Sequence, residues 1–207
     1  MNFGFQKFVG FKSGNVDYQS HRNRYGDVDW WDGLEMKNMP GYTTTLLTTL
    51  SEDYIKENKD KPFCLYIAHA APHSPMQGPN EKAIRTEATL EGDKNSDRPN
   101  KEIYKDMVEE LDWSVGRILE TLKKYKLDKN TFVVFFSDNG PVINNGGSTG
   151  GYRGAKGAPW EGGHRVPGIC YMPGTVKGGT MCKQTVMSFD LFPTMLDMAN
   201  IHYDDSK

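Results

Sequence analysis

The segment that most constrains the fold is an apolar run that stops abruptly in a turn. The run Val133–Phe136 reads Val-Val-Phe-Phe, which predicts a buried β-strand, and the following Ser-Asp-Asn-Gly-Pro predicts the turn that ends it. In open α/β sheets, ligands bind beyond the carboxyl ends of strands. Asp138 and Asn139 would therefore present oxygen ligands there, which suit Ca²⁺ or Mg²⁺ better than a soft metal. Taken alone, the same residues make an equally good β-turn.

Hydrophobic periodicity predicts helices and strands on both sides of this turn. In residues 101–125, apolar side chains recur at helical spacing, and the charge changes from acidic to basic as the helix dipole favours. The other predicted helices are residues 43–58 and 190–200, and the predicted strands are residues 63–68, 131–136 and 166–172. The first 40 residues are rich in glycine and aromatic residues and are expected to be irregular. This order of elements indicates an α/β layered fold.

Composition narrows the range of partners. The net charge of −2 gives no electrostatic reason to bind nucleic acid or an anionic membrane, and the longest apolar runs are too short to span a bilayer. The three cysteines, Cys64, Cys170 and Cys182, lack metal-like spacing and are expected to be buried free thiols, with one disulfide plus one unpaired thiol as the alternative.

Two further loops carry residues suited to an anion. His69 and His73 follow the predicted strand at residues 63–68, and a histidine at a sheet edge can donate to an anionic oxygen or bind a metal. A proline-rich turn with hydrogen-bonded histidines is the plainer interpretation, especially for His69. Residues 151–167 are rich in glycine, which lets backbone amides approach an anion, and Lys156 adds a positive charge. A flexible surface loop is the alternative there. Together the three loops suit a tetrahedral oxyanion ester with a divalent cation.

Six segments resemble the sulfatases, within the alkaline-phosphatase-like superfamily, both in their amino-acid sequences and in their order along the chain. The segments are residues 4–11 (GFQKFVGF) with Asp17-Tyr18, residues 61–75 (KPFCLYIAHAAPHSP), residues 111–119 (LDWSVGRIL), residues 137–141 (SDNGP), residues 153–157 (RGAKG) with 160–167 (WEGGHRVP), and residues 189–199 (FDLFPTMLDMA). The resemblance implies a three-layer α/β sandwich with a mostly parallel central sheet. Residues 1–207 would be the middle and later part of such a catalytic domain.

The resemblance also implies roles for four residues. Asp138 and Asn139 would bind Ca²⁺, while His73 and Lys156 would hold the sulfate oxygens and neutralise charge on the leaving oxygen. Cations placed where negative charge develops lower the barrier of such a reaction. In the family, a hydrated formylglycine attacks sulfur, the alcohol leaves, and the aldehyde is regenerated as sulfate departs. The implied substrate is an aryl sulfate or a sulfated glycan.

The chain departs from the family pattern at the nucleophile. Formylglycine forms from Cys or Ser in the pattern Cys/Ser-x-Pro/Ala-x-Arg, and none of the three cysteines lies in it. The acidic pair that completes the family's metal shell is also not found. The expectation is a fragment that is inactive alone, binds Ca²⁺ weakly, and leaves strand edges and apolar surface uncovered.

Two other functions stay open at this point. A phosphomonoester or phosphonate hydrolase of the same superfamily would use similar residues, and a non-catalytic relative would bind an anion or a partner without turnover. The nucleophile would discriminate among these functions. A periplasmic or extracellular location is expected for the intact parent by analogy alone, since the first residues carry no recognisable signal peptide.

Overall fold

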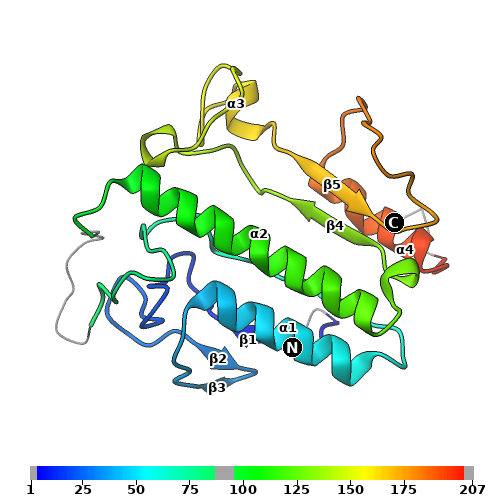
Figure 1. The fold of residues 1–207 in the computed structure, drawn as a ribbon, viewed down its shortest axis with the longest axis horizontal. Helices are drawn as coiled ribbons and strands as arrows, with labels where there is room; N and C mark the ends of the chain where they lie inside the picture. The colour runs from blue at the N-terminus through cyan, green and yellow to red at the C-terminus, as the bar shows by residue number, and fades with distance from the viewer. Residues whose placement is uncertain (1–3, 87–95, 203–207) are drawn as a thin grey trace.

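A computed structural model describes residues 4–86 and 96–202 of the chain (Figure 1). Its strands are β1 (Val9–Gly10), β2 (Trp31–Asp32), β3 (Glu35–Met36), β4 (Val133–Phe136) and β5 (Gly168–Tyr171). Its α-helices are α1 (Thr43–Asn58), α2 (Asn100–Lys124), α3 (Glu161–His164) and α4 (Leu191–Met198), and its 3-10 helices are η1 (Asp128–Asn130), η2 (Ile143–Asn145) and η3 (Ser188–Asp190). The fold therefore mixes α and β, as predicted.

Helices α1 and α2 form the framework, and both match their predicted bounds closely. They lie side by side and run in the same direction (Figure 1). Small hydroxyl side chains make the close approach possible: the Thr48 hydroxyl donates to the Ser114 hydroxyl across 2.6 Å, and both residues are buried. At the outer side, the Arg117 guanidinium lies 2.8 Å from the Glu52 carboxylate. The shared interface is thus polar at its centre and charged at its rim.

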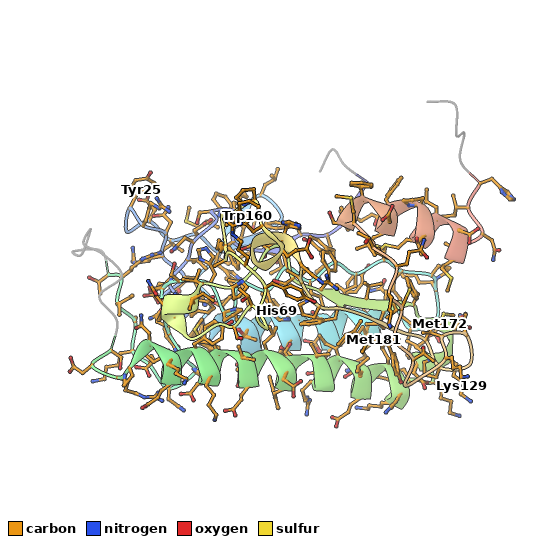
Figure 2. The ribbon with its side chains drawn as sticks, turned by 90° about the horizontal axis from the view of Figure 1, so that it is seen from above. Tyr25, His69, Lys129, Trp160, Met172 and Met181 are labelled. Carbon is orange, nitrogen blue, oxygen red and sulfur yellow. The ribbon has the colours of Figure 1, made fainter. Side chains whose placement is uncertain are left out.

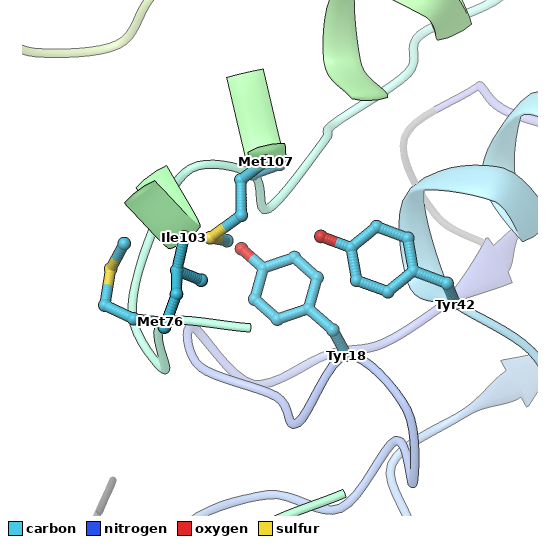
Figure 3. Close-up of a cluster of buried hydrophobic side chains, with 6 residues drawn as sticks. Tyr18, Tyr42, Met76, Ile103 and Met107 are labelled. Atoms are coloured by element: carbon cyan, nitrogen blue, oxygen red, sulfur yellow. The ribbon is translucent and has the colours of Figure 1, made fainter. Parts of the chain in front are cut away.

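The main hydrophobic cluster joins α2 to three distant segments. It consists of Tyr18, Tyr42, Ala71, Met76, Ile103 and Met107 (Figure 3). The rings of Tyr18 and Tyr42 stack with centroids 5.5 Å apart, and their hydroxyl groups donate to the carbonyls of His73 and Gln77. This cluster fixes the proline-rich loop on the beginning of α2.

The N-terminal region is more ordered than its composition suggested. Strands β1, β2 and β3, of two residues each, form a small antiparallel sheet, while most of the region is irregular, as predicted. The buried Asp17 carboxylate holds this region on residues 77–85, because it accepts hydrogen bonds from the backbone amides of Gln19, Ser20, Ile84 and Arg85 and from the side-chain amide of Gln77. Polar contacts between distant residues, which no local pattern reveals, organise this part of the chain.

The predicted central sheet is only partly formed. Residues 63–68 alternate in exposure as a strand would, but they pair with no strand within the described ranges. Strand β4 pairs with β5 in antiparallel register, and the described residues contain no parallel pair. The prediction that Val133–Phe136 is buried was wrong, since Phe136 is 39% exposed. A strand is buried only when other strands and layers cover it, and here one neighbour covers one edge.

The C-terminal part carries much uncovered apolar surface. The predicted strand and helix there are present as β5 and α4, yet none of their residues is buried. The exposed apolar side chains include Ile169, Met181, Val186, Met187, Phe189 and Phe192. Cys64, Cys170 and Cys182 are free, as predicted, but exposed rather than buried, because the surfaces on which they lie are uncovered. In the described part of the chain, no helix is long and apolar enough to cross a membrane.

Candidate anion and metal site

The turn after β4 presents two oxygen-bearing side chains. The Asp138 side chain is exposed, and within residues 4–86 and 96–202 its carboxylate makes no hydrogen bond or ion pair. The turn is closed by the Ser137 hydroxyl, which donates to the Asn139 carbonyl across 3.0 Å. Carboxylate and amide oxygens are ligands that Ca²⁺ accepts, so the residues fit this ion in kind. They are too few in number, because the described residues hold no cluster of three or more His, Cys, Asp or Glu side chains suited to a metal.

Backbone hydrogen bonds dock the lysine loop, residues 151–167, on this turn. The Gly140 amide donates to the Gly163 carbonyl across 2.8 Å, and the Lys156 amide donates to the Pro141 carbonyl across 3.0 Å. Lys156 therefore lies against the residues that directly follow Asp138 and Asn139. The structure brings these three predicted site residues into one region by main-chain contacts.

Glycine makes this docking possible. A Cβ atom on Gly140 would lie 2.0 Å from the Gly162 carbonyl oxygen, and one on Gly163 would lie 2.0 Å from the Ala158 carbonyl oxygen. No real Cβ atom sits that close to an oxygen, so only glycine allows the turn and α3 to approach so closely. The glycine-rich sequence, for which a flexible surface loop was the alternative interpretation, gives a closely packed loop.

Lys156 combines a fixed backbone with an available side chain. Its amide is held by Pro141, whereas its ammonium group makes no ion pair or hydrogen bond within the part of the chain that the structure describes. The side chain is exposed. An ammonium group offers three hydrogen-bond donors and a positive charge, which suits an anionic oxygen.

His73 is held from both its backbone and its ring. Its amide donates to the Ala70 carbonyl across 2.8 Å, and its own carbonyl accepts the Tyr18 hydroxyl across 2.9 Å. The ring Nδ1 lies 2.8 Å from the Ser74 carbonyl. Because a carbonyl only accepts, Nδ1 carries the proton, and Nε2 is the nitrogen left to meet a ligand. The side chain is exposed, so this nitrogen is accessible.

His69 serves the framework. Its Nε2 lies 3.2 Å from the Ser114 hydroxyl, which in turn accepts from Thr48, so the ring joins the polar centre of the α1–α2 interface. Burial lowers the pKa of His69 to about 4, and its buried Nδ1 has no partner within the described residues. The ring is therefore neutral near pH 7, in keeping with the plainer interpretation of this histidine.

Helix α2 connects the proline-rich loop of residues 69–75, the histidine loop, with the loop that follows residues 137–141, the turn predicted to bind the metal and called the metal turn below. Ile103 and Met107 belong to the cluster that carries the proline-rich loop. One turn away, a Cβ on Gly146 would lie 3.1 Å from Lys101 Cα, and one on Gly147 would lie 3.4 Å from the Tyr104 hydroxyl. The same stretch of α2 thus supports both His73 and the segment that follows Asp138.

The lysine loop also contains contacts that local patterns did not reveal. The Arg153 guanidinium stacks 3.7 Å from the ring centre of Trp160, and Arg165 lies 4.5 Å from that of Tyr152. Arg165 also pairs with Glu161 at 3.0 Å, a contact that their spacing of four residues does suggest. The Arg153–Trp160 stack depends on the loop folding back on itself, which no periodicity signals.

Comparisons with known proteins agree on one family. The family described as Sulfatase matches residues 1–201. The chain is 35% identical over 164 residues to steryl-sulfatase of Rattus norvegicus, which covers 75% of this chain and 26% of that protein. It is 31% identical over 210 residues to arylsulfatase J of Mus musculus, which covers 98% of this chain and 34% of that protein.

Solved structures give the same result. A structure described as Ps i-CgsB in complex with k-i-k-neocarrahexaose matches with a TM-score of 0.82 at 27% identity, over 98% of this chain and 47% of that one. A putative sulfatase, yidJ, from Bacteroides fragilis matches with a TM-score of 0.67 at 21% identity, over 95% of this chain and 44% of that one, which shows a shared fold. The chain thus spans about a quarter to a third of the curated relatives' length and about half that of the matched structures.

Proposed function

Because the chain belongs to the sulfatase family, we propose that it forms the cation-binding and sulfate-binding part of an enzyme that hydrolyses sulfate esters. The observation that carries this proposal is the docking of the lysine loop on the metal turn, which places Lys156 against the residues that follow Asp138 and Asn139. A cation site near a lysine whose backbone is held in place suits an ester that bears a negative charge.

Each of the four residues has a role that follows from its surroundings. Asp138 and Asn139 would hold Ca²⁺ through their side-chain oxygens, and the ion, when bound, would supply positive charge next to the ester. Lys156 donates to a sulfate oxygen and opposes the negative charge that builds up as the ester bond breaks. His73 meets the ester through Nε2, and in its protonated form it is a second donor.

The mechanism in the intact enzyme is a formylglycine mechanism, and this chain does not complete it. Formylglycine, when present, supplies the oxygen that attacks sulfur, but none of the three cysteines in these 207 residues lies in the required pattern. We therefore expect the purified chain to be inactive and to bind Ca²⁺ weakly. In the intact enzyme, residues 63–68 and β4 belong to one mostly parallel central sheet, which is consistent with their uncovered edges.

A carbohydrate sulfate is the substrate class we favour. The structural relative bound to k-i-k-neocarrahexaose matches nearly the whole chain at 27% identity. Tyr152 and Trp160 flank Lys156 in the sequence, and their side chains are 42% and 46% exposed. Exposed aromatic rings of this kind can pack against a sugar ring, whereas a small leaving group would not need them. An aryl sulfate, as the names of the curated relatives suggest, is the competing class.

The experiment is a binding titration of the purified chain with 4-nitrophenyl sulfate, with and without Ca²⁺, followed by NMR. We expect binding that weakens at least about tenfold in Lys156→Met, which loses one charge-assisted contact. Lys129→Met, which removes an exposed charge at the far end of the molecule from Trp160, is the control (Figure 2). Binding that is equal in both variants would refute the role of Lys156, and rapid turnover by the chain would refute its inactivity.

A further inference from the structure

Arg153 differs from three other arginines in the described part of the chain. Arg98, Arg117 and Arg165 each pair with a carboxylate at 2.8 to 3.0 Å. Arg153 is exposed and makes no ion pair within the described ranges, and its contact is with the ring of Trp160. Its positive charge is therefore uncompensated, although its position is fixed by the aromatic ring.

Stacking prepares a guanidinium group to bind an anion. The group rests with its carbon 3.7 Å from the centre of the Trp160 ring, a contact that offsets part of the cost of ordering a long side chain. Cation–π stacking uses the face of the guanidinium and leaves its N–H donors in the plane free for a second partner. A planar fork of donors matches the oxygens of a sulfate or carboxylate, and the exposed part of the indole offers an apolar surface beside it.

The position of Arg153 links it to Lys156. The two residues are three apart, and the backbone of each is held: the Arg153 carbonyl accepts from Gly162 across 2.8 Å, and the Lys156 amide donates to Pro141. Between them, Gly154 adopts φ +84, and a Cβ there would lie 3.0 Å from the Trp160 Cβ. The loop therefore turns sharply and brings the side chain of Trp160 against the segment that joins the two cations.

The charge of the loop also favours a polyanion. Residues 151–167 contain three Lys or Arg residues and one carboxylate, Glu161. Arg165 already engages Glu161 at 3.0 Å. Among the described residues, Arg153 and Lys156 are thus two cations without a carboxylate partner on one closely packed loop, whereas a single sulfate ester requires only one of them.

We propose that Arg153 and Trp160 form a subsite for a second anionic group on a sulfated carbohydrate, beside the sulfate that Lys156 holds. Arg153 binds the second sulfate or a carboxylate through its N–H donors, and Trp160 fixes the guanidinium and contacts the sugar ring. This inference rests on the proposed function, and it adds that multiply charged carbohydrates bind better than simple monosulfates.

The test is an NMR titration of the purified chain at constant ionic strength with galactose 6-sulfate and galactose 2,6-disulfate. The reporter is the indole N–H signal of Trp160, assigned with Trp160→Phe. We expect at least tenfold tighter binding of the disulfate by the wild type. Arg153→Met keeps most of the apolar stem and lowers this preference to within about twofold while leaving monosulfate binding unchanged. Arg153→Lys, which keeps the charge but loses the fork, is intermediate.

The outcomes separate this inference from the proposed function. A disulfate preference that persists in Arg153→Met, or that Lys129→Met lowers equally, overturns the subsite. A loss of monosulfate binding in both Arg153→Met and Arg153→Lys also overturns it, since Arg153 would then only support the loop. If the wild type binds neither ligand, or if Lys156→Met binds both as the wild type does, the proposed function itself fails.

Discussion

Replacing Gly140 by alanine tests whether the metal turn and the lysine loop form one unit. The new methyl group would meet the Gly162 carbonyl oxygen at 2.0 Å, where backbone lies on both sides and no flexible side chain can give way. Overpacking of this kind costs about 1–3 kcal/mol, and loss of the hydrogen bond from the Gly140 amide to Gly163 adds about 1 kcal/mol. The docked state should therefore lose about 2–4 kcal/mol relative to the undocked one.

Amide hydrogen exchange measures this loss directly. The amides of Gly140 and Lys156 donate to the carbonyls of Gly163 and Pro141, across the contact between the turn and the lysine loop, so undocking exposes both amides to solvent. A cost of about 2 kcal/mol or more should speed their exchange by roughly 30-fold or more, because each ~1.4 kcal/mol is tenfold in an equilibrium constant. The affinity for 4-nitrophenyl sulfate should fall as well, since the Lys156 backbone would no longer be held against the turn that carries Asp138.

Gly116 provides the matched control. It lies in α2 with nothing within 4 Å of its ideal Cβ position. Gly116→Ala should leave exchange at Gly140 unchanged and stabilise the helix by about 0.5–1 kcal/mol, since alanine has the higher helix propensity. If Gly140→Ala exchanges at the wild-type rate, the close approach of the turn and α3 is not a feature of the molecule in solution, and the argument for a joint site is refuted.

Three further variants probe other parts of the molecule. Asp138→Ala removes one of two oxygen ligands and should weaken Ca²⁺ binding in calorimetry by at least about tenfold, and an unchanged affinity would mean that the ligand assignment is wrong. The pKa of His69 is about 4 in the folded state, against about 6.5 in an unfolded chain, so the unfolded state binds more protons between these values. Stability should therefore fall as the pH falls from 6.5 to 4, by up to about 3 kcal/mol in urea titrations, and His69→Gln should lose this component. Equal pH slopes in the two proteins would contradict that reasoning. Phe192 is 69% exposed, so Phe192→Ser should change stability by less than about 0.5 kcal/mol. The substitution should also reduce self-association in sedimentation experiments, because it removes an exposed apolar ring. Unaltered association would show that this surface does not mediate self-association.

Local patterns predicted the elements of the framework well. Helices α1 and α2 lie within one residue of their predicted ends, because helical spacing over many residues leaves little choice of period. Strands β4 and β5 were also found where apolar runs end at turn residues. The burial of β4 was predicted wrongly, since burial depends on what covers a strand and not on the strand itself. The same reason explains the exposed cysteines.

The sequence predicted which residues belong to the candidate site, but not how these residues are arranged in space. Residue types and the sequence motifs of the loops singled out four residues: Asp138, Asn139, His73 and Lys156. Their roles stay predictions. The contacts of Arg153 with Trp160 and of Gly140 with Gly162 were not foreseen. Each joins residues that are brought together by the folding of a loop with no regular period.

The sequence by itself determined the family, the two long helices and the chemical kinds of side chain at the site. These follow from the order of short motifs and from hydrophobic periodicity, which are properties of the chain alone. Only the tertiary structure decided that a glycine-rich loop packs against the metal turn, that Asp17 binds the N-terminal region to residues 77–85, and that the surface around β5 and α4 is uncovered. Such contacts form between residues that are far apart in the sequence or in irregular loops. The local pattern of side chains along the chain therefore does not predict them.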